Sequence, residues 1–137
     1  MNAGFLDTNI LLYSISRHPA ETAKRERAIA LIEQDHWRLS TQVLQEFYVQ
    51  ATRPSRPDAP PHDIAAGLAR TWMRFPVQEI SSAIVVAAFE IKSRYGFSYW
   101  DAAIIAAALA QGCALLYSED MQHGQMVETL RIVDPFR

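Results

Sequence analysis

The sequence predicts an α/β fold, a three-layer α/β/α sandwich around a central, mostly parallel sheet. Short apolar runs, typical of strands buried on both faces, alternate with longer segments of helical periodicity, and this alternation is typical of a parallel sheet covered by helices. Half of the 137 residues are hydrophobic and a fifth are charged, which suffices for a buried core and excludes intrinsic disorder. We expect a single domain over residues 1–137.

The first half of the chain alternates strands with helices. Residues 3–6 form an apolar run that stops at the polar residues 7–9, as is typical of a strand followed by a turn. Pro19 marks the start of a surface helix over 20–34. Residues 37–40 predict a second strand, and apolar positions at helical spacing predict a helix from Thr41 to Ala51.

The second half repeats the alternation after a loop. Four of the seven prolines fall in residues 54–61, which excludes a regular element there. Gly96 and Gly112 are expected to end two of the following helices, and Ser98 to cap the second of them. The expected helices cover residues 63–75, 82–95 and 98–111, and the expected strands cover 77–80, 114–117 and 130–133.

Charge and cysteine content limit the class of protein. Thirteen Lys and Arg oppose fifteen Asp and Glu, and this net charge of −2 argues against a simple electrostatic binder of nucleic acid. The lone Cys113 can form no internal disulfide, which fits a reducing compartment. No signal peptide and no apolar run of about 18 residues is visible, so we expect a cytoplasmic protein with no membrane partner.

Acidic residues directly follow two predicted strands. Asp7 follows the first strand, and Ser118, Glu119 and Asp120 follow the strand over 114–117. In open parallel sheets ligands bind beyond the carboxyl ends of the strands, so this edge is the expected site. The alternative is that each acid is an ordinary turn or cap residue.

Two further acids lie on predicted helices. Asp101 precedes nine apolar residues, and a helix that is apolar all round is buried, so this carboxylate needs a partner. It is either a ligand or part of a capping box with Ser98, and the two roles are compatible. Glu46 lies at the border of the apolar face of its helix, where it is either a site residue or an ordinary flanking glutamate.

Asp7, Glu46, Asp101 and Asp120 can converge where strands end and helices begin. Carboxylates held close together repel one another unless a cation neutralises them. Oxygen ligands alone select hard ions, so the expected metal is Mg²⁺ or Mn²⁺. The four histidines lack zinc-like spacing, although His123 lies close to the last acidic segment.

Four segments in order resemble the acidic motifs of PIN-domain ribonucleases, and among these the VapC type of toxin in bacterial toxin–antitoxin pairs. The segments are Phe5-Leu6-Asp7-Thr8-Asn9-Ile10-Leu11, Ser40-Thr41-Gln42-Val43-Leu44-Gln45-Glu46-Phe47, Ser98-Tyr99-Trp100-Asp101-Ala102 and Leu116-Tyr117-Ser118-Glu119-Asp120-Met121-Gln122-His123-Gly124. The resemblance extends over the whole chain. It implies an endoribonuclease that uses Mg²⁺ or Mn²⁺ and leaves a 5′-phosphate and a 3′-hydroxyl.

The resemblance also implies the role of each residue. Asp7, Glu46 and Asp101 would be the principal metal ligands, and Asp120 would complete the pocket. Glu119 is the alternative to Asp120, but a hydroxyl two residues before the acid favours Asp120.

The supporting residues follow from the same resemblance. Thr8 and Asn9 would orient the site, and Ser118 stands where the family often has threonine. Separately from the resemblance, Arg53 and Arg56 form one of three basic clusters along the chain and are the candidate contacts with RNA.

The resemblance further implies a cognate antitoxin and a homodimer. The aromatic residues Trp72, Phe75, Tyr95 and Tyr48 are candidates for a groove that holds a partner helix, with core packing as the alternative.

Other classes compete with this interpretation. An aspartyl phosphatase would need a second Asp where Asn9 stands, and a phosphate-binding NTPase would need a glycine-rich loop with a lysine, which the chain lacks. A stand-alone nuclease of the same fold, or a metal-free module that binds RNA or protein, stays open.

Overall fold

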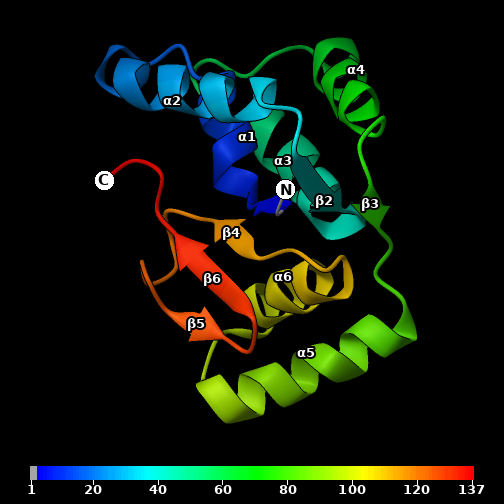
Figure 1. The fold of residues 1–137 in the computed structure, drawn as a ribbon. Helices are drawn as coiled ribbons and strands as arrows, with labels where there is room; N and C mark the ends of the chain where they lie inside the picture. Colours follow the sequence, from blue (N-terminus) through cyan, green and yellow to red (C-terminus); the bar gives the residue numbers. More distant parts are fainter. Residues whose placement is uncertain (1–2) are drawn as a thin grey trace.

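The structure is a computed structural model that describes residues 3–137. Six strands form one sheet in the order β3-β2-β1-β4-β6-β5, and every neighbouring pair is parallel except β5 and β6 (Figure 1). The strands are β1 (Gly4–Leu6), β2 (Trp37–Ser40), β3 (Val77–Gln78), β4 (Leu115–Tyr117), β5 (Met126–Val127) and β6 (Leu130–Val133).

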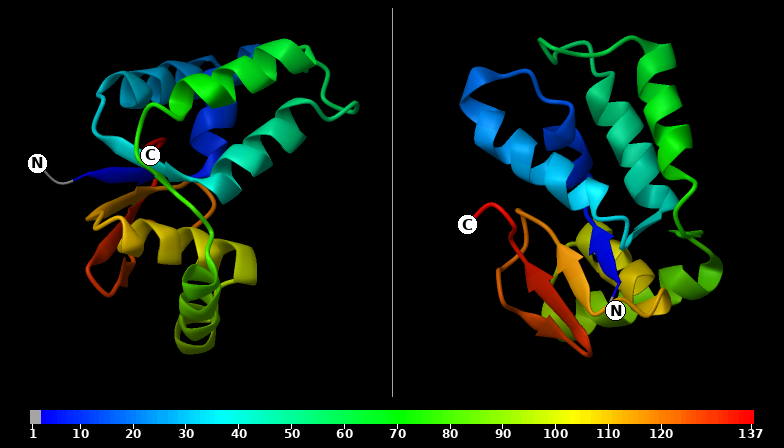
Figure 2. Two further views of the ribbon diagram at one scale, coloured as in Figure 1. Left: turned by 90° about the vertical axis from the view of Figure 1, so that its right-hand side faces the viewer. Right: turned by 45° about the horizontal axis from the view of Figure 1, so that its top comes forward.

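Helices cover both faces of the sheet. Helices α1 to α4 lie on one face, and α6 lies on the other with α5 outside it (Figures 1 and 2). This arrangement confirms the predicted α/β/α sandwich. The helices are α1 (Thr8–Ser14), α2 (Thr22–Glu33), α3 (Thr41–Ala51), α4 (His62–Trp72), α5 (Ser82–Tyr95) and α6 (Tyr99–Ala110), and a short 3₁₀ turn, η1 (Pro19–Glu21), precedes α2.

Two elements differ from the prediction. Residues 7–9, expected to be a turn, lead directly into helix α1, because the Asp7 carboxylate caps this helix and Ile10 and Leu11 are buried beneath it. Strand β5 was not expected, since its two residues give no periodic signal; it pairs antiparallel with β6.

Helix ends follow the expected local chemistry. The Ser98 hydroxyl accepts from the backbone N–H of Asp101 and so caps α6, while Ser81 caps α5 in the same way. Gly96 ends α5 with φ of 80°, a left-handed conformation that other residues adopt at a cost. Residues 102–108 of α6 are all buried, as its apolar sequence predicts.

Trp72, Phe75 and Tyr95 serve mainly in packing. Trp72 is buried in the core, and Phe75 and Tyr95 pack against it. Tyr48 bonds to His62 through its hydroxyl. These side chains therefore contribute to the packing that is the alternative to a groove, and a groove for a partner helix at them stays a prediction. In the part of the chain described, every helix is too short or too polar to cross a bilayer.

The order of the strands places a crevice beside β1. From β1 the chain moves outward to β2 and β3, and it later returns to β4 on the other side of β1. Ligands of open α/β sheets bind at such a reversal, outside the carboxyl ends of the strands. Asp7 follows β1 there, Ser118 follows β4, and α3 begins directly after β2.

Candidate functional site

Asp7 is the buried centre of the site. Only 4% of its surface is exposed; one carboxylate oxygen accepts from the Thr8 backbone N–H at 2.7 Å, and the other accepts from the Ser118 hydroxyl at 2.7 Å. Burial raises its pKa to about 7; the two hydrogen bonds oppose this rise, and the charges of Asp101 and Asp120 add to it. The ionised form of Asp7 is therefore disfavoured, and a nearby cation would stabilise it.

Asn9 connects Asp7 with the loop after β4. Its side-chain amide donates to Asp120 at 3.0 Å and, more weakly, to Asp7 at 3.5 Å. The Ser118 hydroxyl that donates to Asp7 also accepts from the backbone N–H of Asp120 at 3.2 Å. These bonds hold Asp120 at the mouth of the site, where its side chain is exposed.

Glu46 reaches the site from helix α3. One of its oxygens accepts from the Thr8 hydroxyl at 2.8 Å, and the other accepts from the Gln42 amide at 3.3 Å. Thr8 therefore joins Asp7 and Glu46, because its backbone N–H bonds the first acid and its hydroxyl bonds the second. The position is half-buried, as the border of an amphipathic helix predicts.

Asp101 faces the other acids from the first turn of α6. Its burial raises the pKa of the carboxyl, and the charges of Asp120 and Glu46 raise it further, against a bond with Ser98. The capping bond uses the backbone N–H of Asp101, while its carboxylate also bonds Ser98 and lies near enough to Asp120 and Glu46 to be affected by their charges. Asp101 thus takes part in the cap of α6 and also lies near the other acids, two roles that the sequence predicts to be compatible.

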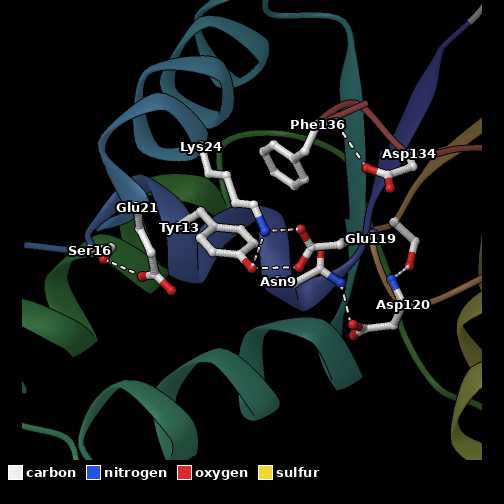
Figure 3. A network of polar contacts seen from close by, with 10 residues as sticks. Asn9, Tyr13, Ser16, Glu21, Lys24, Glu119, Asp120, Asp134 and Phe136 are labelled. Atoms are coloured by element: carbon white, nitrogen blue, oxygen red, sulfur yellow. Dashed lines mark hydrogen bonds and ion pairs between the residues drawn. The ribbon is translucent and has the colours of Figure 1, made fainter. Parts of the chain in front are cut away.

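Glu119 points away from the acids. Its carboxylate accepts from the Tyr13 hydroxyl and from the Lys24 ammonium, each at 2.5 Å, while Asp120 lies against Asn9 (Figure 3). Burial alone would raise the pKa of Glu119, but the bonds from Lys24 and Tyr13 bring it below its ordinary value. Of the two neighbouring acids, Asp120 is the one that lies with Asp7.

The donor set suits a hard cation. The four acids offer carboxylate oxygens, the Asn9 and Gln42 amides act on them only as donors, and the charges of the acids raise the pKa values of Asp7 and Asp101 in the absence of a positive charge. Among residues 3–137, however, no three acidic, His or Cys side chains are close enough to form a complete ligand set. The four acids form an open acidic cluster, and a bound cation would draw their carboxylates closer together.

The basic candidates differ in their position. Arg56 pairs with Asp58 at 3.0 Å and lines a surface cavity of about 210 Å³ together with Asn9 and Asp120. Arg53 is exposed and lies outside that lining. His123 accepts from the backbone N–H of Asp134 through Nδ1 and so connects the segment after β4 with the end of β6.

Three residues of the site were not predicted from the sequence. Gln42 holds Glu46, and its spacing of one helical turn before Glu46 could have revealed it. Tyr13 and Lys24 hold Glu119 across 106 and 95 residues, and no local pattern signals such a contact.

The chain was compared with known families, curated sequences and solved structures. The family model of the PIN domain matches residues 4–127. Among curated protein sequences none matches the chain.

Solved structures share the fold at low identity. VapC20 of Mycobacterium tuberculosis, described as a sarcin-ricin loop cleaving toxin, is 21% identical with a TM-score of 0.68, over 86% of this chain and 90% of that one. A toxin–antitoxin complex from Klebsiella pneumoniae is 18% identical with a TM-score of 0.72, over 97% and 98%. DNA-bound VapBC from Salmonella typhimurium is 18% identical with a TM-score of 0.67, over 98% and 99%.

Proposed function

Because the chain belongs to the PIN-domain family, we propose that it is a divalent-metal-dependent endoribonuclease and the toxin of a toxin–antitoxin pair. The observation that carries the proposal is the buried Asp7 carboxylate, which faces Asp101 and Asp120 at the carboxyl edge of the sheet. The charges of Asp101 and Asp120 act on Asp7, and that of Glu46 acts on Asp101. Structural packing alone gives no reason to bring acids from four separate segments this near one another.

The acidic cluster supports a divalent cation as the cofactor. Asp7, Glu46 and Asp101 would hold Mg²⁺ or Mn²⁺, with Asp120 at the mouth. When bound, such an ion lowers the pKa of its water and neutralises charge on the phosphate.

Three other side chains keep the acids in place for this chemistry. The Thr8 N–H and the Ser118 hydroxyl fix the two oxygens of Asp7, and Asn9 fixes Asp120. Because these donors are neutral, they orient the carboxylates and leave their charge available for a cation.

RNA would approach along the basic side of the mouth. Arg56 lines the same cavity as Asp120, so its guanidinium can neutralise a phosphate beside the acids. Arg53 is exposed on the same loop and would contribute a more distant contact.

The biological class is supported by the structural neighbours. One is described as a toxin–antitoxin complex, one as DNA-bound VapBC and one as a toxin that cleaves the sarcin-ricin loop. By analogy, the partner of this chain would be a cognate antitoxin that covers the acidic cluster, and the chain would form a homodimer.

Cleavage by the purified protein tests the enzymatic proposal. We expect wild type to cut RNA in Mg²⁺ or Mn²⁺ and to stop in EDTA, and Asp7→Asn to lose cleavage while keeping its fold. The loss should exceed the roughly 10- to 100-fold effect of an outer-shell substitution, because a ligand charge is removed. Cleavage that persists undiminished in EDTA would contradict the metal mechanism, and a folded wild type without cleavage in any metal would favour the metal-free binding module.

A further inference from the structure

The buried amide of Gln42 lies between the helices that carry Glu46 and Asp101. We propose that Gln42 is a positioning residue that aligns these two acids for a divalent cation, an inference that rests on the proposed function. Gln42 is neither one of the four acids nor one of the residues that the sequence predicts to orient them.

Both hydrogens of the Gln42 amide nitrogen have partners at the site. Nε2 donates to the Glu46 carboxylate at 3.3 Å and to the backbone carbonyl of Trp100 at 3.0 Å. Trp100 directly precedes Asp101 in the first turn of α6. One amide therefore connects the acid of α3 with the turn that presents the acid of α6.

The orientation of Glu46 is fixed from two sides. The Thr8 hydroxyl bonds one of its oxygens at 2.8 Å, and the Gln42 amide bonds the other. A carboxylate with both oxygens bonded cannot rotate freely, so its remaining lone pairs keep one direction. Helices α1, α3 and α6 are thereby held together at the site.

Burial and neutrality both favour this role. Gln42 is only 7% exposed. A buried amide lowers the stability of the fold unless its N–H groups donate hydrogen bonds. An amide orients a carboxylate through a hydrogen bond without supplying a positive charge, whereas a lysine or arginine here would compete with a cation. The loss of Gln42 should therefore weaken metal binding by releasing Glu46 and the start of α6.

The test measures Mn²⁺ affinity in the absence of RNA, by calorimetry, together with cleavage kinetics and thermal melting. Gln42→Met removes both donors and keeps the length of the side chain. We expect Mn²⁺ affinity and kcat to fall about tenfold with little change in KM for RNA. Gln45→Met is the matched control, because Gln45 is exposed on the same helix, and it should bind Mn²⁺ like wild type.

A double-mutant cycle separates positioning from a general structural effect. If Gln42 acts through Glu46, the Gln42→Met/Glu46→Gln double mutant should lose less Mn²⁺ affinity, relative to wild type, than the product of the fold losses of the two single mutants. Fully multiplicative losses, or a folded Gln42→Met protein with wild-type affinity, would overturn the inference. Should Gln42→Met fail to fold, Gln42→Asn replaces it, since its amide is one methylene too short to hold both acceptors, and the same two outcomes decide.

The wild-type titration keeps the two proposals distinguishable. A wild type that binds no Mn²⁺ contradicts the proposed function itself. A wild type that binds Mn²⁺, beside a Gln42→Met protein that binds it equally well, leaves the nuclease proposal intact and removes Gln42 from the site.

Discussion

Asp7 combines two roles that a protein usually keeps apart. Its carboxylate caps helix α1, which stabilises the fold, and it is also buried among acids, which opposes its ionisation. Because the pKa of Asp7 differs between the folded and unfolded states, the stability of the protein depends on pH.

The metal-free protein should lose stability as the pH rises. The pKa of Asp7 is raised from 3.8 to about 7, so between these values the folded state binds more protons than the unfolded state. The free energy of unfolding then decreases as the pH rises from about 4 to about 7 and stays level above that range, as far as Asp7 is concerned. Melting curves from pH 5 to 8 in EDTA measure this decrease.

Substitution identifies the group responsible. Asp7→Asn should remove much of the pH-dependent decrease, whereas Glu90→Gln, at an exposed position of α5, should keep it. An Asp7→Asn protein with the same pH dependence as wild type would exclude Asp7 as its source.

Asp101 allows capping and ligand binding to be tested separately. Its backbone N–H makes the capping bond, so Asp101→Leu keeps the cap and removes the carboxylate. We expect cleavage to be lost while the free energy of unfolding changes by no more than about 1 kcal/mol, because the lost helix-dipole interaction is offset by relief of repulsion.

The matched variant at the same turn is Ser98→Ala. It removes the cap and keeps the carboxylate, so it should cost about 1 kcal/mol of stability and leave most of the cleavage activity. The opposite result, an active Asp101→Leu protein with a clearly lowered melting temperature, would show that Asp101 is chiefly structural.

At the scale of elements, α1 and α2 together determine which acid after β4 belongs to the site. Tyr13 of α1 and Lys24 of α2 hold Glu119, and Phe136 packs edge-on against the Tyr13 ring with centroids 4.9 Å apart (Figure 3). The loop can therefore present only one of its two acids to Asp7.

Two substitutions at neighbouring positions test this arrangement. Asp120→Asn should lower cleavage strongly, since it removes a charge that faces Asp7 and Asp101. Glu119→Gln should keep most of the cleavage and cost at most about 1 kcal/mol of stability, because its partner Lys24 is 41% exposed. Cleavage rates and melting temperatures of both proteins provide the measurement, and a greater loss of activity in Glu119→Gln would reverse the assignment.

Local sequence could predict the elements of the fold and the position of the acids. Apolar runs mark the strands, and Ser98 and Gly96 mark helix ends. Asp7 and Asp120 follow strands, Asp101 lies in the first turn of α6, and Glu46 lies in the middle of α3. Helix α1 could not be predicted, because its seven residues are too few for a periodic pattern and its polar start has the composition of a turn.

Contacts between distant segments could not be predicted either. Ser118 meets Asp7 across 111 residues, and Lys24 meets Glu119 across 95. Their pairing depends on strand order and on how α2 packs against α1, which no local pattern encodes. The sequence therefore indicated the candidate acids and, through the resemblance, Thr8, Asn9 and Ser118 beside them, but it did not indicate the contacts of Gln42, Tyr13 and Lys24.

At the scale of the whole molecule, the proposed ribonuclease activity implies a partner that covers the open acidic cluster. We expect the protein purified alone to be a homodimer by light scattering, and to cleave RNA. Co-expression with the product of an adjacent small gene should give a stable complex without cleavage. A strict monomer that binds no such product and is not toxic on expression would favour a stand-alone nuclease or a binding module.

The sheet itself restricts how any partner can bind. Its two outermost strands in the described chain, β3 and β5, have two residues each, so few backbone groups at either margin are free to pair with an added strand. Such short margins protect a small protein with a largely apolar sheet from edge-to-edge aggregation. They also leave β-augmentation little to build on, so a second copy or an antitoxin has to recognise helical surfaces and loops, and a strand-like peptide designed to extend this sheet should fail to bind.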